Sequence, residues 1–142
     1  MIIAVKGIIV KNKKYLLQLR DKKKNIYFPN FWGLFGGTVE NNETAREALV
    51  REIKEETNLS VKVSSRVLLT KYELFSSKQK YKTIYYLCKI IRKKKIILTE
   101  GQQYKFFSMK RIKKISIVPW DIVAISLASL KKSNKNFFPR KK

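Results

Sequence analysis

The sequence predicts a single α/β domain, and three features of its 142 residues support that prediction. Several runs rich in β-branched and aromatic residues have the pattern of strands. A well-capped helical pattern lies in the middle of the chain, and a second, more apolar one lies near the C-terminus. The length suits one domain with a hydrophobic core, which we place at residues 1–131. A basic tail, 132–142, follows and is expected to be poorly ordered.

The first part of the chain has the pattern of a β-hairpin. Residues 2–10 and 15–20 are predicted strands, and a Lys-Asn-Lys-Lys turn joins them. A polar, lysine-rich loop follows over residues 21–30. The next segment is aromatic and ends in Gly36-Gly37, where two glycines permit a tight turn.

The central helix has a clear start and a clear end. Thr44 and Glu47 form a capping-box pair, so the helix should begin near Thr44. Asn58 lies where the helix should end in a left-handed conformation, which Asn tolerates best after Gly. The predicted core-facing stripe consists of Leu49, Val50 and Ile53.

The second half predicts more strands and a last helix. Residues 61–75 and 81–91 have strand composition and are joined by a polar connection, and the first of these strands has room for a break. A shorter aromatic strand is predicted at 104–107. The helical pattern of residues 122–130 comes directly after Val118-Pro119-Trp120-Asp121.

Three glutamates on the central helix form a candidate metal site. Glu52, Glu55 and Glu56 are related by i, i+3 and i+4, so they share one helix face. Like charges at this spacing repel each other, and a cation between them relieves that repulsion. Carboxylate oxygens suit a hard divalent ion, Mg²⁺ or Mn²⁺. The alternative is a solvated acidic helix.

The spacing around these glutamates resembles the Nudix box, the motif of the Nudix hydrolase family. The matching positions are Gly37, Glu43, Arg51, Glu52, Ile53, Glu55 and Glu56. Two positions depart from the family pattern. Asn58 stands where the family usually has Gly after the Glu-Glu pair, and Phe35 replaces the Pro of a Pro-Gly-Gly segment. We interpret the Asn58 change as mild, and beside Phe35 the two glycines still permit the tight turn.

The resemblance covers roughly residues 2–130 and implies an α/β/α sandwich with a mixed β-sheet. It also implies Mg²⁺- or Mn²⁺-dependent hydrolysis of a diphosphate linkage in a nucleoside diphosphate derivative. Glu52, Glu55 and Arg51 are the implied catalytic candidates, and the base is left open between Glu52 and Glu55. Glu43, Arg51 and Gly37 have implied structural roles. The implied metal ligands are Glu52, Glu55, Glu56, Glu100 and the backbone of Gly37.

Glu100 enters this set through a second resemblance. The segment Thr99-Glu100-Gly101-Gln102 precedes an aromatic strand, as in the 8-oxo-dGTP-cleaving branch of the family. That likeness implies a metal ligand or base at Glu100, and the alternative is a surface glutamate in a loop. Relatives also contact the base near the start of the last helix. Trp120 could stack on a base there and Asp121 could accept its hydrogen bonds, although an acid near a helix N-terminus is favoured in any case.

The substrate stays open at this level. A nucleoside triphosphate such as an oxidised purine nucleotide, or a nucleotide sugar, fits the motif. The alternatives are an RNA 5′-pyrophosphohydrolase and a non-catalytic nucleotide-binding regulator. Isomerase chemistry on the same fold is disfavoured, because the single cysteine, Cys88, lies in an apolar strand.

Charge and composition limit the partners. The net charge is +23, with 33 basic and 10 acidic residues, and six of the ten acids lie between residues 40 and 56. A polyanion should be attracted to such a protein. We interpret most lysines as solvated surface, so a small nucleotide is favoured as partner over nucleic acid.

One cysteine and no histidine exclude a zinc cluster and an internal disulfide. With no membrane-length apolar run or signal peptide, we expect a cytoplasmic monomer or homodimer.

Overall fold

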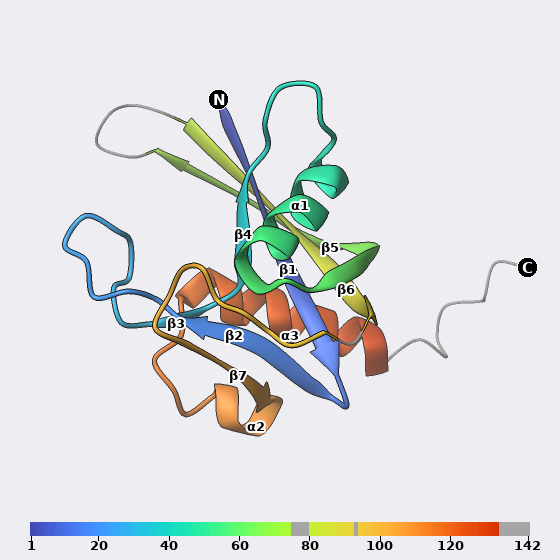
Figure 1. Cartoon of the computed structure of the whole chain (residues 1–142). Coiled ribbons are helices and arrows are strands. Elements are labelled where there is room, and N and C mark those ends of the chain that lie inside the picture. The colour runs from blue at the N-terminus through green and yellow to red at the C-terminus, as the bar shows by residue number, and fades with distance from the viewer. Residues whose placement is uncertain (75–79, 93, 134–142) are drawn as a thin grey trace, which may run out of the picture.

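One mixed sheet with helices on both faces makes up the protein (Figure 1). The computed structural model describes residues 1–74, 80–92 and 94–133. The elements are β1 (Ile2–Lys11), β2 (Lys14–Leu19), β3 (Trp32–Gly33), β4 (Phe35–Thr38), α1 (Ala45–Thr57), β5 (Ser60–Leu74), β6 (Lys80–Arg92), β7 (Gln103–Ser108), α2 (Met109–Ile112) and α3 (Pro119–Ser133). The predicted single-domain α/β/α sandwich is confirmed.

Strand β1 lies at the centre of the seven-stranded sheet. One of its edges pairs in parallel with β6, and β5 extends the sheet antiparallel to β6. The other edge pairs antiparallel with β4 over Ala4–Gly7 and with β2 at Val10 and Lys11. Two strands therefore share one edge of β1, and the cleft described below is lined by residues from β1, β2 and β4.

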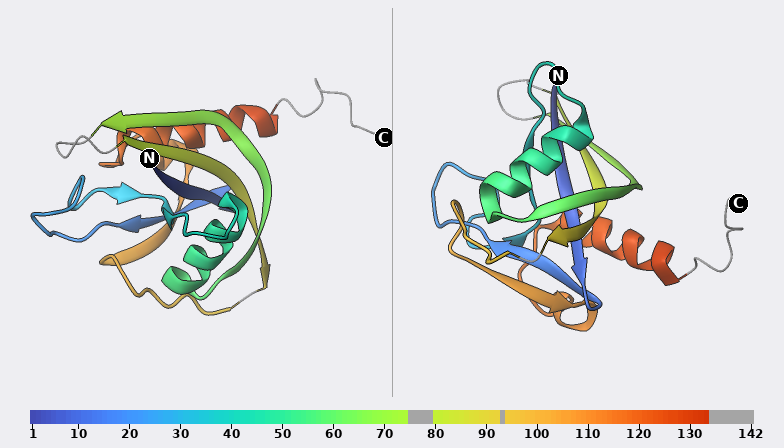
Figure 2. Two further views of the ribbon diagram at one scale, coloured as in Figure 1. Left: turned by 90° about the horizontal axis from the view of Figure 1, so that it is seen from above. Right: turned by 45° about the vertical axis from the view of Figure 1, so that its right-hand side comes forward.

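Each face of the sheet carries its own buried core. Val5 and Ile9 of β1 pack in the core beneath α1, whereas Ile8 packs in the core beneath α3. This alternation follows from the two-residue period of a strand. Figure 2 shows α1 and α3 on opposite sides of the sheet. The helices contribute Ala48, Leu49 and Ile53 to the first core and Ala124, Ile125 and Ala128 to the second.

The predicted long elements are present, with small shifts of their ends. The hairpin turn contains Asn12 and Lys13 with φ of 50° and 62°, as tight two-residue turns require. Strand β5 is continuous but has register shifts, the last between Arg66 and Thr70. The short elements β3, β4 and α2 were not predicted. Their two to four residues are too few for a periodic pattern.

The prediction that Val50 faces the core is wrong. Val50 is 38% exposed, and Ala48 is fully buried in its place. A helix turns about 100° per residue, so Val50 points away from the face that Leu49 and Ile53 cover.

Two predictions reach beyond the described part of the chain. Residue 75 of the predicted strand 61–75 lies outside it, as do residues 134–142 of the predicted tail, while 132 and 133 end α3. Within the described ranges, no helix is long and apolar enough to cross a membrane.

Candidate functional site

Helix α1 is fixed at both ends, and this positions its glutamates. The Glu47 N–H donates to Thr44 Oγ1 and the Thr44 N–H donates to Glu47 Oε1, both at 3.1 Å. At the other end Asn58 has φ of 68°, and its N–H donates to the Lys54 carbonyl at 2.9 Å. Both predicted caps are thus present. Glu56 follows Glu52 by four positions, just over one helical turn, so the two side chains face the same strand, β4.

The two glycines of β4 allow α1 to approach this closely. A Cβ atom on Gly37 would overlap the carboxylate of Glu52, and one on Gly36 would overlap the backbone carbonyl of Val5. Gly37 therefore makes room for a carboxylate, whereas Gly36 makes room for strand pairing. The Pro-to-Phe departure at residue 35 leaves both glycines in place, and the Phe35 ring is fully buried in the core beneath α1.

Arg51 joins the loop before α1 to the glutamates on it. Its guanidinium donates to both oxygens of Glu43, at 2.6 and 3.1 Å, and to the Thr38 carbonyl at 3.2 Å. Its Nη1 also donates to Glu52 Oε1 at 3.0 Å and to Glu55 Oε2 at 3.4 Å. The bond to Arg51 lowers the pKa of Glu43, and Glu43 in turn raises the pKa of Arg51. Arg51 thus stays charged and holds two glutamates of the acidic face.

Glu56 is the most unusual acid of the site. It is only 7% exposed, and its Oε2 is buried without a hydrogen-bond partner among the described residues. Burial raises its pKa to about 8; the charges of Glu52 and Glu100 act in the same direction, and a hydrogen bond from the Gly36 N–H opposes them. A buried oxygen that lacks a donor is costly unless a positive partner reaches it.

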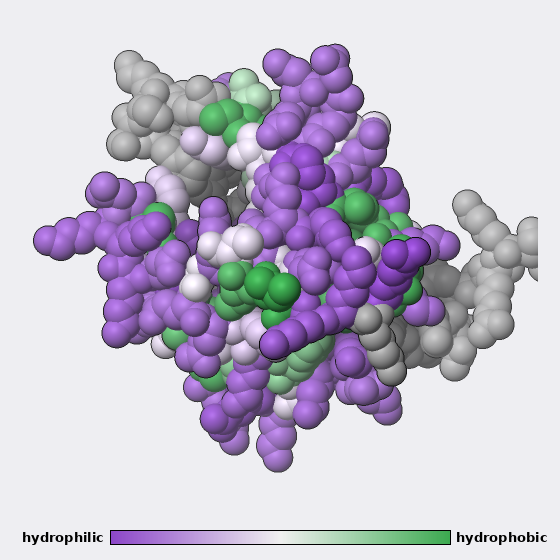
Figure 3. Space-filling model, viewed as in Figure 1, coloured by the Kyte–Doolittle hydropathy of each residue, from purple (hydrophilic) through white to green (hydrophobic). Residues whose placement is uncertain are grey.

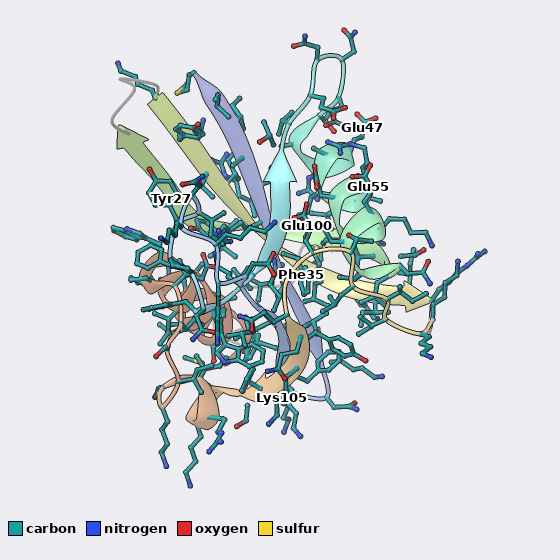
Figure 4. All side chains as sticks on the ribbon, turned by 60° about the vertical axis from the view of Figure 1, so that its left-hand side comes forward. Tyr27, Phe35, Glu47, Glu55, Glu100 and Lys105 are labelled. Atoms are coloured by element: carbon teal, nitrogen blue, oxygen red, sulfur yellow. The ribbon has the colours of Figure 1, made fainter. Side chains whose placement is uncertain are left out.

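Glu100 joins the same acidic group from the segment that precedes β7. Thr99 Oγ1 donates to the Glu55 carbonyl at 3.2 Å, and the Thr99 N–H donates to the Glu56 carbonyl at 3.3 Å. These bonds fasten the segment before β7 to the last turn of α1, and Figure 4 shows Glu55 and Glu100 on these two elements. Burial raises the pKa of Glu52, Arg51 opposes this, and Glu55 and Glu100 raise it further.

The acidic group fits a hard divalent cation by its chemistry. In the described part of the chain, no three acidic side chains already converge as a ready-made cage. Arg51 holds one oxygen each of Glu52 and Glu55, so those two oxygens already have a positive partner. The orphaned Oε2 of Glu56 and the upward pKa shifts of Glu52 and Glu56 are the signs expected where carboxylates need a positive partner. Such oxygens are the ligands that Mg²⁺ and Mn²⁺ prefer.

A cleft of about 380 Å³ is lined by Glu56 and Glu100, whereas Glu52 and Glu55 are not among its described lining residues. Glu56, Glu100 and the two glycines line one part of it, and the remaining charged and polar lining includes Lys6, Gln18, Arg20, Asp21 and Lys23. Its volume is in the range of small-molecule sites. The face of the protein drawn in Figure 3 is mostly hydrophilic.

The two base-contact candidates lie in different environments. Trp120 is 44% exposed, and it is not among the described residues that line the cleft. Asp121 is fully buried and accepts hydrogen bonds from Lys6 Nζ, at 2.9 and 3.1 Å, and from the Leu34 N–H, at 2.9 Å. Tyr85 also bonds to Asp121, and burial and this acid raise the pKa of Tyr85. Contact between Asp121 and a ligand would thus pass through Lys6.

Sequence reasoning missed Lys6 and Gln18 as cleft residues. The signal for Lys6 was present, because it is the one charged side chain in the apolar run of residues 2–10. Its partner is 115 residues away, so no local pattern could identify it.

Comparison with known proteins places the chain in a family. The model of the NUDIX domain matches residues 2–128. An ADP-ribose pyrophosphatase of Methanocaldococcus jannaschii is 54% identical over 63 residues, which are 44% of this chain and 36% of that protein. The dihydroneopterin triphosphate diphosphatase of Escherichia coli is 36% identical over 66 residues, 43% of this chain and 40% of that protein. The matched region therefore spans less than half the length of these relatives.

Solved structures agree on the fold. The E. coli ORF135 protein superimposes with a TM-score of 0.78 at 23% identity, over 99% of this chain and 95% of that one. A C. elegans Ap4A hydrolase superimposes with a TM-score of 0.75 at 20% identity, over 94% of this chain and 99% of that one. With the glycine cradle, the Arg51–Glu43 pair and the acidic face of α1, the match over residues 2–128 leads to one conclusion: the chain belongs to the Nudix family.

Proposed function

We propose that the protein hydrolyses the diphosphate linkage of a nucleoside diphosphate derivative with the help of Mg²⁺ or Mn²⁺. The observation that carries this proposal is the buried Glu56 oxygen that lacks a hydrogen-bond partner among the described residues. It belongs to a cleft that Glu100 also lines, and it lies near enough to Glu52 to feel the charge of that carboxylate. The relatives support the reaction class, because their names describe a pyrophosphatase and a triphosphate diphosphatase.

Each residue of the site then has a defined task. Glu52, Glu55, Glu56, Glu100 and the Gly37 carbonyl would hold the divalent cation. When bound, that cation would neutralise phosphate charge and lower the pKa of an attacking water. Glu52 or Glu55 would accept the proton of a water whose oxygen attacks phosphorus, while the bridging P–O bond breaks and the other phosphate leaves with its oxygen. Arg51 fixes both glutamates through its Nη1.

The basic residues of the cleft suit the substrate's phosphates. Arg20 and Lys23 line the cleft together with the carboxylates, so they can attract a polyanion and orient it towards the acidic end. We propose a nucleoside triphosphate, such as an oxidised purine nucleotide, or a nucleotide sugar as substrate. A cytoplasmic monomer or homodimer remains part of this proposal.

An RNA 5′-end substrate is the second candidate, and the net charge of +23 favours it. The m7GpppN-mRNA hydrolase NUDT17 of Xenopus laevis is 47% identical over 62 residues, 44% of this chain and 21% of that protein. Salt separates the two candidates. Affinity for an RNA that contacts many lysines falls steeply with salt concentration, whereas affinity for a small nucleotide falls less.

The test is the Glu55→Gln variant. Phosphate release should be measured with Mg²⁺ across nucleoside triphosphates, nucleotide sugars, dinucleoside polyphosphates and 5′-triphosphate RNA. Loss of this carboxylate should lower kcat by about 10²-fold or more. The Glu55 side chain is 59% exposed, so thermal stability should hardly change.

Glu47→Gln is the matched control. It makes the same chemical change on the same helix, and Gln also satisfies a capping box. Its kcat should stay close to that of the parent protein. Equal turnover by both variants would contradict the role of Glu55. If the parent protein hydrolyses none of the substrates tested, the non-catalytic regulator is favoured instead.

A further inference from the structure

Lys6 lines the cleft, and its side chain contacts Asp121 near the start of α3. In the sheet it sits between Gly36 of β4 and Tyr85 of β6, and it lines the cleft together with Glu56 and Leu34. Its side chain bonds to Asp121 of α3, so it projects to the α3 face of the sheet. Glu56 approaches the same strands from the α1 face. The cleft is therefore lined by Glu56 from the α1 face and by a lysine whose side chain reaches α3 on the opposite face.

The Lys6–Asp121 pair is held rigidly. Lys6 Nζ lies 2.9 Å from Asp121 Oδ1 and 3.1 Å from Oδ2. The buried Asp121 carboxylate also accepts bonds from the Leu34 N–H and from Tyr85, so its position is fixed from three directions. The Lys6 side chain keeps 24% of its surface exposed, whereas that of Asp121 has none.

The Lys6 ammonium keeps donor capacity beyond its bonds to Asp121. An ammonium group has three N–H donors, and at most two of them are taken by the two oxygens of Asp121. The Lys6 ammonium is also paired with the Asp121 carboxylate, so it is less available for phosphate than a lysine without a carboxylate partner. The exposed Lys23 is better placed for phosphate. Leu34 and Ile26 provide apolar lining nearby, which suits a flat nucleobase.

We propose that Lys6 is a specificity-determining residue that donates a hydrogen bond to a carbonyl oxygen of the substrate's base. Asp121 is its positioning residue. The inference rests on the proposed nucleotide substrate and narrows it. A donor at this place accepts a 6-oxopurine, whereas adenine presents an amino group there and would leave two donors facing each other.

The test compares two nucleotides that differ at this edge, inosine triphosphate and ATP. The kcat/KM of the parent protein should favour inosine triphosphate by about tenfold or more, the size expected for one buried hydrogen bond and one mismatched donor. Lys6→Met should bring that ratio close to one. Lys23→Met is the matched control: it removes a charge from the same cleft, so it should lower both values together and preserve the ratio.

Two further measurements keep the result decisive. Lys6→Met leaves the Asp121 charge buried and unpaired, so Lys6→Met/Asp121→Asn serves if the single variant does not fold. Asp121→Asn alone should also reduce the ratio, because Lys6 loses its anchor, and a purely structural role would leave the ratio unchanged.

Equilibrium binding of both nucleotides to the Glu55→Gln protein separates this inference from the proposed function. A binding preference for inosine triphosphate that depends on Lys6, with no hydrolysis of any substrate in the screen by the parent, would sustain the inference and reject the hydrolase. Hydrolysis of both nucleotides with a ratio that Lys6→Met does not change would overturn the inference alone. If neither nucleotide is bound or cleaved, the inference falls, and the wider substrate screen decides the hydrolase proposal separately.

Discussion

Replacing Glu56 by Gln should change how the stability of the metal-free protein depends on pH. The folded pKa of Glu56 is about 8, whereas its ordinary value is 4.5, and burial is the main cause. Between these two values the folded protein keeps a proton that the unfolded chain has released. Unfolding therefore releases a proton, and the free energy of unfolding falls as the pH rises.

The size of this effect follows from the two pKa values. From about pH 5.5 to about pH 7.5, Glu56 alone should lower the free energy of unfolding by about 2.5 kcal/mol. Glutamine is neutral at every pH, so the variant lacks this contribution. Urea unfolding in the presence of a chelator, followed by circular dichroism at several pH values, measures both proteins.

The difference between the two proteins isolates Glu56 from the other titrating groups, because those are common to both. Parallel stability curves across this range would refute the reasoning and show that Glu56 titrates near its ordinary pKa. Added Mg²⁺ or Mn²⁺ should stabilise the parent protein above about pH 7 and the variant much less, because only the parent gains a charged carboxylate to bind the ion.

Three other predictions concern the surroundings of the carboxylates. Gly37→Ala should displace Glu52 and lower kcat about tenfold or more, with a small loss of stability. Gly36→Ala should lower the free energy of unfolding by more than about 3 kcal/mol, because its Cβ meets a backbone carbonyl. Activity assays and urea unfolding distinguish the two variants, and a larger loss of stability in Gly37→Ala than in Gly36→Ala would contradict the packing. Lysine in Arg51→Lys cannot form the bidentate bond to Glu43, so the free energy of unfolding should fall by about 1 to 3 kcal/mol and activity should fall as well. An unchanged melting temperature would contradict a stabilising role of the Arg51–Glu43 pair. Asn58→Ala should lower the free energy of unfolding by about 1 kcal/mol, because φ is 68°, whereas Asn58→Gly should change it by less than about 0.5 kcal/mol. Equal destabilisation of the two variants in thermal unfolding would contradict the left-handed cap.

Local rules explain what could be predicted in advance. The start of α1 at Thr44 and its end at Asn58 depend on residues within one turn of each other, so the sequence reveals them directly. The shared face of Glu52, Glu55 and Glu56 follows from helix geometry alone. Val50 was misplaced because the width of a buried stripe depends on the neighbouring strand, which helix periodicity does not describe.

By itself, the amino-acid sequence determined the hairpin, the caps of α1 and the acidic face, because each depends on contacts within a few residues. The class of the fold followed from the strand and helix patterns together with the resemblance to the Nudix box. Tertiary structure alone decided which acid is buried, what Asp121 contacts and where Lys6 points. Glu56 is buried by strand β4, and Lys6 meets Asp121 across 115 residues of chain. The physical reason is that strand order, which brings distant residues together, is settled by packing of the whole sheet.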